Sequence, residues 1–336
     1  MPKICYTPKN FGPAGLATIA TANDILEEYA AQGFDLTLRQ LYYQFVARGF
    51  IPNKDTEYKK LGGVVSDARL AGLIDWDHIV DRTRNMRQNG HWSSPEAIIQ
   101  ACAASYQINK WAEQPNYVEV WIEKDALVGV IQGVCSEEDV PYFSCRGYTS
   151  QSEMWSAAMR LMAAQRGGKS CHVVHLGDHD PSGIDMSRDI GARLDLFMNH
   201  HVILDWMLEN KATKWGEGDK AYQERVQTEL LASWKPPITV HRIALNMDQV
   251  EEYNPPPNPA KVTDSRSGPY IDKYGDESWE LDALEPSVLV GLIRDKINDL
   301  RDPDIWDGAC HVEAVQRETL GEVHRQWAKV VKLVKK

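Results

Sequence analysis

The sequence predicts an α/β protein in which a helical N-terminal domain precedes a domain with a mainly parallel sheet and C-terminal helices. Three apolar, strand-like runs, at residues 117–122, 140–145 and 171–176, alternate with helical patterns. This order is typical of a parallel sheet with helices on its faces. Before these runs, three helical patterns follow one another within residues 13–71. With 336 residues, 43% of them hydrophobic, the chain is long enough for two domains.

The N-terminal domain is predicted over residues 1–90. Its expected helices cover residues 13–33, 38–48 and 57–71. Thr37 is a suitable N-cap for the second helix, and Gly49 is a suitable stop. Residues 73–80 alternate in part like a strand, so the pattern is that of a winged helix, a relative of the DNA-binding helix-turn-helix. The alternative is a helical domain with no such role.

The rest of the chain divides into a connector at 91–115, a sheet domain at 116–310, and a C-terminal helix with a basic tail at 311–336. A further strand is expected at 238–245. The proline-rich loop 254–259 is neither helix nor central strand, because proline lacks the N–H group that both require. Helices are expected over residues 95–111, 124–131, 150–165, 184–198, within 199–235, and from 286 onward.

Two carboxylates follow the third predicted strand, at Asp178 and Asp180. Residues two apart in an extended chain point to the same side. Carboxylates gathered in this way repel one another and are costly to bury, and a hard divalent cation such as Mg²⁺ or Mn²⁺ relieves both problems. The alternative is that Asp178 caps the following helix and Asp180 lies in a turn.

Charged residues also end the first two strands. Glu123 follows the first strand and Arg146 follows the second. Ligands of parallel sheets collect at the carboxyl ends of the strands, so Glu123 is expected to join the two aspartates as a metal ligand. Lys124 and Arg146 are then in position to contact a phosphate group. The alternative for these two cations is an ion pair with a neighbour such as Asp125 or Glu153.

The formal net charge of −11 argues against nucleic-acid binding, but the charge is unevenly distributed. Residues 1–100 carry 11 basic and 11 acidic residues, so the excess of negative charge lies beyond them. Within this neutral part, Arg82, Arg84 and Arg87 form a basic cluster that is predicted to bind DNA phosphates. The alternative is a solvated basic face.

The six cysteines are scattered and form no C-x-x-C pair, which argues against a structural zinc site and fits a reducing compartment. No apolar run approaches the length of a membrane span, and the N-terminus lacks the pattern of a secretory signal. A cytoplasmic protein without a membrane segment is therefore expected.

Taken together, these motifs resemble a Toprim domain, whose signature is a Glu after the first strand and a D-x-D after the third. The segment Asp178-His179-Asp180-Pro181-Ser182-Gly183 is similar to the D-x-D-P-x-G of the topoisomerase VI A subunit and its meiotic double-strand-break relatives. Arg39-Gln40-Leu41-Tyr42-Tyr43 resembles the family's R-[DE]-[IL]-Y-Y on a winged helix, although Gln40 replaces the acidic residue. The resemblance covers roughly residues 35–300. The region around the proline-rich loop, about 246–275, matches nothing in the family pattern.

The resemblance implies a specific activity. The second tyrosine of the pair, Tyr43, would attack duplex DNA, assisted by Arg39 and by Mg²⁺, with Mn²⁺ as a substitute. The catalytic set would then be Tyr43, Arg39, Glu123 and Lys124, and the metal ligands would be Glu123, Asp178 and Asp180. In the family, tyrosine and metal come from different subunits, which implies a homodimer. Strand passage would also require an ATPase subunit encoded elsewhere.

The sequence is also compatible with three alternatives. In the first, Tyr43 is not used and the protein is a hydrolytic Toprim nuclease of a phage- or plasmid-defence type, in which metal-activated water cuts the DNA. In the second, the protein binds DNA on a Toprim scaffold without cleaving it. In the third, His175, His179 and Glu280 form a transition-metal site.

Overall fold

The computed structural model describes residues 3–80, 89–209, 228, 238–260 and 264–334. Its centre is a parallel four-stranded sheet with the strand order β2-β1-β3-β4, which confirms the predicted α/β class. The strands are β1 (Asn116–Ile122), β2 (Tyr142–Ser144), β3 (Ser170–Leu176) and β4 (Ile238–Ala244). Because the strands are parallel and in register, the chain leaves β1, β2 and β3 at the same edge of the sheet.

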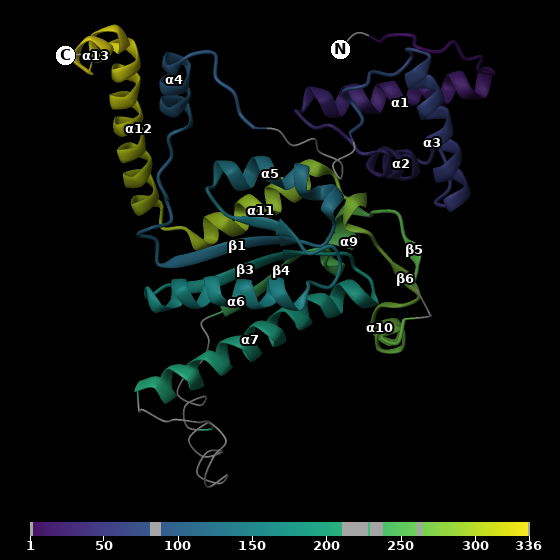
Figure 1. Ribbon diagram of the computed structural model, residues 1–336. Coiled ribbons are helices and arrows are strands. Elements are labelled where there is room, and N and C mark those ends of the chain that lie inside the picture. Colours follow the sequence, from purple (N-terminus) through teal and green to yellow (C-terminus); the bar gives the residue numbers. More distant parts are fainter. Residues whose placement is uncertain (1–2, 81–88, 210–227, 229–237, 261–263, 335–336) are drawn as a thin grey trace.

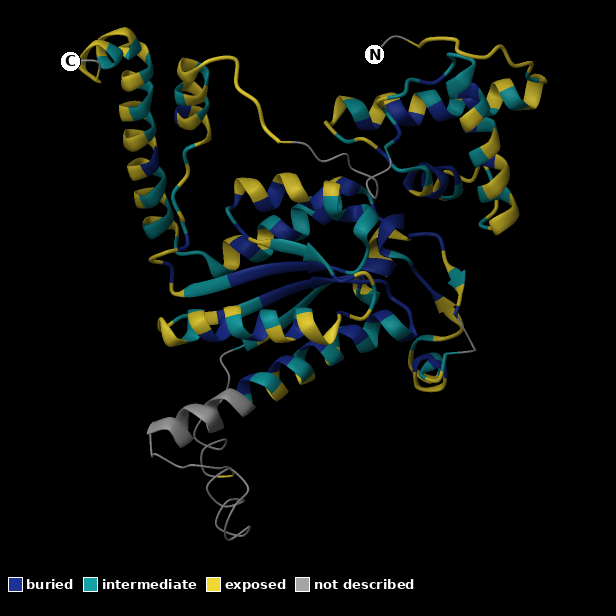
Figure 2. Cartoon of the chain, viewed as in Figure 1, coloured by how far each residue is buried: buried dark blue, intermediate teal, exposed yellow. Residues whose placement is uncertain are grey.

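Helices cover both faces of this sheet (Figure 1). On one face lie α5 (Val128–Glu137) and α11 (Pro286–Leu300), and on the other lie α6 (Gln151–Arg166) and α7 (Pro181–Glu209). Side chains of β1 alternate between the two cores: Val120 packs towards α5 and α11, and Trp121 packs towards α6 and α7. The buried residues accordingly concentrate in the strands and on the helix faces turned towards them (Figure 2). Apolar side chains on both faces are the expected pattern for a parallel sheet.

Two elements near the sheet differ from the sequence prediction. The second strand begins only at Tyr142, since Pro141 has no N–H to donate to the neighbouring strand. The predicted helix 124–131 is a 3₁₀ turn, η1 (Asp125–Leu127), followed by α5.

The N-terminal domain contains the three predicted helices, α1 (Pro13–Ala31), α2 (Leu38–Ala47) and α3 (Asp55–Leu70), around their own core. The Thr37 side chain accepts a hydrogen bond from Gln40 N, which confirms the predicted N-cap. The prediction of a wing-like strand at 73–80 is wrong. Those residues form turns, and within the described part of the chain only Ile79 bridges to Leu36. The basic cluster Arg82, Arg84 and Arg87 lies outside the described residues.

The N-terminal domain contacts the chain segment that follows β4. Beyond α9 (Met247–Tyr253), the proline-rich loop ends in β5 (Asn258–Pro259), which pairs with β6 (Glu277–Ser278) on either side of α10 (Ser267–Tyr274). Asn53 donates hydrogen bonds to Pro257 O, at 2.9 Å, and to Asn258 Oδ1, at 2.7 Å. The Tyr29 hydroxyl also bonds to Glu285. Both contacts hold the N-terminal domain against residues 257–285.

The remaining helices lie at the opposite end of the sheet from this contact. Helix α4 (Pro95–Ser105) packs beside α12 (Pro303–Arg325), and α13 (Trp327–Val334) follows (Figure 1). Trp111 and Trp306 link this pair to the sheet domain through an edge-to-face contact. Among the described residues, none of the helices is both long enough and apolar enough to span a bilayer.

The packing between α6 and the sheet gives a first testable prediction. Leu161 on α6 has no exposed surface. Leu161→Ala is expected to lower the free energy of unfolding by about 2–5 kcal/mol, because it leaves a cavity in a close-packed core. Leu196→Ala on α7, where the side chain is 62% exposed, is the control and should change it by less than about 0.5 kcal/mol. Urea denaturation measures both values, and equal effects would contradict the described packing.

Candidate active site

The turn after β3 places the two predicted aspartates at the start of α7. Asp180 accepts hydrogen bonds from Gly183 N, at 2.6 Å, and from Ser182 Oγ, at 2.9 Å, so it caps the helix. Asp178 Oδ1 instead accepts from Leu281 N at 2.7 Å, across the site. The alternative interpretation assigned the helix cap to Asp178, whereas the structure has Asp180 as the cap. Both carboxylates are buried.

Glu123, at the end of β1, lies beside this turn as predicted. Its Oε2 accepts a hydrogen bond from Asp178 N at 2.8 Å. Burial raises the pKa of Glu123, and Asp180 adds to this, whereas Lys124 and Arg242 oppose it. Burial also raises the pKa of Asp178 to about 7, with Glu123 and Asp282 adding to the effect and Lys124 opposing it. Carboxylates with raised pKa values in a cluster are typical of functional sites.

Lys124 is the counter-ion of this cluster. Its Nζ lies 3.0 Å from Asp178 Oδ1, 2.7 Å from Glu280 Oε2 and 2.6 Å from Asp282 Oδ1. Burial alone would raise the pKa of Glu280, but Lys124 and Arg39 outweigh it and lower that pKa to about 2. Lys124 therefore links the turn after β3 to the segment that contains η2 (Leu281–Ala283).

Arg39 and Tyr43 reach the same cluster from α2. Arg39 Nη2 lies 2.6 Å from Glu280 Oε2, Arg39 Nε lies 3.3 Å from Asp282 Oδ2, and Arg39 Nη2 donates a long hydrogen bond of 3.4 Å to Tyr43 Oη. Lys124 also binds Glu280 and Asp282. It thereby completes a continuous set of polar contacts from Tyr43 to Asp178. These residues are widely separated in the sequence and meet within one chain.

Tyr43 is more deeply buried than its position on the helix indicates. The helical spacing of the apolar residues puts it off the buried face of its helix, but its side chain is only 2% exposed. The reason is that α2 packs against η2 as well as against its own domain, so both sides of the helix are covered. Burial raises the pKa of Tyr43, Asp282 and Glu280 raise it further, and Arg39 opposes the shift.

Arg146 forms the ion pair with Asp125 that was the alternative to its predicted contact with a phosphate group. Its guanidinium pairs with Asp125 at 3.1 Å and is 72% exposed. Its backbone adopts a φ of +53°, a conformation that non-glycine residues rarely adopt, followed by Gly147 at +84°. It is not among the cations that contact the buried carboxylates, although its exposed head remains available to a ligand.

Two further residues belong to this site and were not predicted from the sequence. Asp282 is 3% exposed and binds both Lys124 and Arg39. Asp282 lies two residues after Glu280, the same spacing as that of Asp178 and Asp180. This spacing could have identified Asp282 from the sequence. Arg242 on β4 lies beneath the turn after β3, and nothing in its local sequence distinguishes it.

The donor groups of this cluster suit a hard divalent cation. Five carboxylates face three cations, which leaves a formal excess of two negative charges. The carboxylates are Glu123, Asp178, Asp180, Glu280 and Asp282, and the cations are Arg39, Lys124 and Arg242. In the described part of the chain, however, no three His, Cys, Asp or Glu side chains are arranged to hold an ion. Lys124 lies against Asp178, and Asp180 is turned towards Gly183 N and the Ser182 hydroxyl, so binding requires these side chains to rotate.

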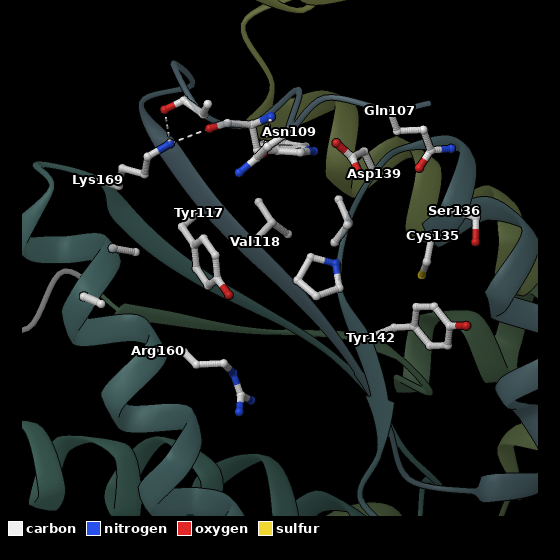
Figure 3. A pocket seen from close by; sticks show the side chains of 16 residues that line it. Gln107, Asn109, Tyr117, Val118, Cys135, Ser136, Asp139, Tyr142, Arg160 and Lys169 are labelled. Atoms are coloured by element: carbon white, nitrogen blue, oxygen red, sulfur yellow. Dashed lines mark hydrogen bonds between the residues drawn. The ribbon is translucent and has the colours of Figure 1, made fainter. Parts of the chain in front are cut away.

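The two histidines of the transition-metal alternative have other partners. His175 Nδ1 lies 2.8 Å from Ser187 Oγ, and His179 Nδ1 lies 2.8 Å from the Tyr270 hydroxyl. A pocket of about 890 Å³ lies at the opposite edge of the sheet, by the starts of β1 and β3, where Tyr117, Tyr142 and Lys169 line it (Figure 3). None of the predicted site residues lines that pocket.

The raised pKa of Asp178 gives a pH-dependent prediction. Its pKa rises from 3.8 to about 7 on folding, so the folded state retains a proton that the unfolded state releases. Its contribution to stability is therefore present at low pH and is lost as the pH rises through about 7. We expect the free energy of unfolding of Asp178→Asn, relative to wild type, to be higher at pH 8 than at pH 5 in metal-free buffer. Urea denaturation at both pH values tests this, and a difference independent of pH would contradict it.

Comparisons of the chain with protein-family models, with curated proteins and with solved structures found no match.

Proposed function

We propose that the protein cleaves DNA with a divalent cation, Mg²⁺ or Mn²⁺, using its N-terminal helical domain and a Toprim domain, as in the topoisomerase VI A subunit. The N-terminal domain would bind DNA through its helices, since residues 73–80 do not form the predicted wing strand. The observation that supports DNA cleavage is the continuous set of contacts from Tyr43 through Arg39, Glu280 and Lys124 to Asp178. It brings a nucleophile, two cations and a carboxylate cluster together from separate parts of the chain.

Each residue has a defined role in this proposal. The Tyr43 hydroxyl gives its proton to solvent and its oxygen attacks phosphorus. The bond to the leaving DNA oxygen breaks, and that oxygen takes up a proton from solvent. The phosphotyrosine retains the energy needed for religation. Arg39 stabilises the phenolate and the phosphate, and Lys124 binds a phosphate oxygen once it leaves Asp178. Glu123, Asp178 and Asp180 would hold the cation, which neutralises and orients the phosphate.

Hydrolysis is the second candidate, and the burial of Tyr43 favours it. A tyrosine that is 2% exposed and has a raised pKa is a poor nucleophile in this conformation. In this case the carboxylates act on a water molecule and the tyrosine has a structural role. The transesterase proposal instead requires the contact of Arg39 with Glu280 and Asp282 to open when DNA binds.

The proposed partners follow from the resemblance. DNA is the substrate, a second copy of the chain would form a homodimer, and an ATPase subunit would be needed for strand passage. Tyr43 already lies beside Glu280 and Asp282 of its own chain. In a homodimer of the family type, Tyr43 would act at the metal site of the other copy. The transesterase proposal therefore requires Tyr43 to leave the carboxylates of its own chain.

The test is cleavage of supercoiled plasmid by the wild-type chain with Mg²⁺, with Mn²⁺ or with a chelator. The proposal predicts nicked or linear DNA with either metal and intact plasmid with the chelator. Tight binding of the plasmid without cleavage under all three conditions would instead support the non-catalytic alternative.

A further inference from the structure

Arg242 makes an unusual number of contacts with the turn that bears the two aspartates. Its guanidinium donates hydrogen bonds to four main-chain carbonyls and to one hydroxyl. The acceptors are Gly177 O at 3.0 Å, Asp178 O at 2.6 Å, Gly183 O at 2.9 Å, Leu245 O at 3.1 Å and Ser187 Oγ at 3.0 Å. One side chain of β4 thus joins both ends of the turn 177–183 to the end of its own strand.

These contacts fix the main chain and leave the carboxylates to other partners. No ion pair of Arg242 with a carboxylate is present within 4.0 Å among the described residues, although Glu123, Asp178 and Asp180 all lie near enough to oppose the lowering of its pKa by burial. A planar fork of N–H donors suits several carbonyls at once, whereas the single ammonium of lysine does not reproduce that geometry. The contribution of Arg242 therefore depends on the shape of the guanidinium as well as on its charge.

The close packing at Gly177 shows how tightly the turn is held. A Cβ atom at this position would lie 2.8 Å from Glu123 Oε2 and 3.3 Å from Arg242 Nη1. A Cβ atom at Gly183 would lie 2.2 Å from Asp178 O, which is one of the carbonyls that Arg242 binds. Both glycines thus permit the main chain to approach the carboxylate and the guanidinium.

We propose that Arg242 is the positioning residue of the carboxylate site: it holds the turn 177–183 so that Asp178 and Asp180 meet Glu123 where the divalent cation binds. This inference rests on the metal site of the proposed function. Residues that orient metal ligands without touching the metal commonly contribute about 10- to 100-fold to metal affinity.

The chain offers a matched control at the opposite edge of the sheet. Lys169 also binds main-chain carbonyls with a cation, those of Trp111, Ala112 and Gln114, and it lines the pocket in Figure 3. Removing it should lower stability without affecting the turn after β3. The Lys169 variant therefore shows what the loss of any carbonyl-binding cation does. An effect seen only in the Arg242 variant then belongs to the turn that bears the aspartates.

The experiment compares wild type, Arg242→Lys and Lys169→Met as full chains, each first shown to unfold cooperatively. Calorimetric titration with Mn²⁺ is expected to show binding weakened about 10- to 100-fold in Arg242→Lys, although the charge is kept, and unchanged binding in Lys169→Met. Hydrogen exchange should be faster at residues 177–183 in Arg242→Lys alone.

Mn²⁺ affinity and exchange rates in Arg242→Lys equal to those of wild type would overturn the proposal. Equal weakening in Lys169→Met would also overturn it, because the effect would then be one of general stability. A wild-type chain that binds no Mn²⁺ removes the metal site and this inference together. A wild-type chain that binds Mn²⁺ and loses it in Arg242→Lys, but leaves plasmid uncut, sustains the inference and contradicts DNA cleavage alone.

Discussion

Asp178→Asn is expected to reduce DNA cleavage by about 10³-fold or more, since a metal ligand that stabilises transition-state charge contributes several kcal/mol and each 1.36 kcal/mol is a factor of ten in rate. Asp178 lies at the centre of the cluster, where its backbone N–H binds Glu123 and its carboxylate binds Lys124. The amide of asparagine keeps the size of the side chain and removes its charge. Initial rates of plasmid nicking with Mn²⁺ measure the effect.

Asp299→Asn is the matched control for this substitution. Asp299 pairs with Lys296 on the surface of α11, and its side chain is 65% exposed. Its replacement should leave the cleavage rate within about twofold of wild type, because exposed ion pairs contribute little. A rate for Asp178→Asn equal to that of the control would contradict a catalytic role for the carboxylate cluster.

Tyr43→Phe has the second-largest expected effect. If the tyrosine oxygen is the nucleophile, its removal should eliminate covalent protein–DNA product and reduce cleavage by at least about 10³-fold. The fold should survive, because among the described residues the hydroxyl receives only the long hydrogen bond from Arg39. Gels run with and without protease digestion measure the covalent product, since protein attached to a DNA end retards the fragment.

Tyr42→Phe is the control from the adjacent position. The Tyr42 hydroxyl bonds to Asn53 and accepts from Lys54 N, within the N-terminal domain. This variant should retain cleavage and covalent product. If Tyr43→Phe cuts DNA as fast as Tyr42→Phe and no protein remains on the ends, water is the nucleophile and the hydrolytic candidate replaces the transesterase.

The sheet was predictable from the sequence because its signals are local. Apolar runs that alternate with helical patterns identified β1, β3 and β4, and the change from strand to helix located Glu123, Asp178 and Asp180. The wing was not predictable in this way. Partial alternation at 73–80 indicated a strand, but a strand needs a partner along its length. Within the described part of the chain, only the bridge of Ile79 to Leu36 forms.

The environment of the site residues depends on contacts that no local pattern records. The burial of Tyr43 comes from η2, some 240 positions along the chain, and a helical wheel describes only the packing within one helix. The role of Lys124 as counter-ion depends on Glu280 and Asp282 in the same way. Arg242 binds carbonyl groups, which every residue possesses, so its position in the sequence carries no signal.

Mapping the DNA attachment site tests most directly whether Tyr43 and the carboxylate cluster form one DNA-cleaving centre. Duplex DNA is incubated with the wild-type chain and Mn²⁺, the mixture is denatured and digested with protease and nuclease, and peptides carrying a nucleotide are sought by mass spectrometry. If they do, a nucleotide is expected on Tyr43 with Mn²⁺ and is absent when a chelator replaces the metal. DNA left intact, or a nucleotide on another residue, would contradict a single centre of this kind.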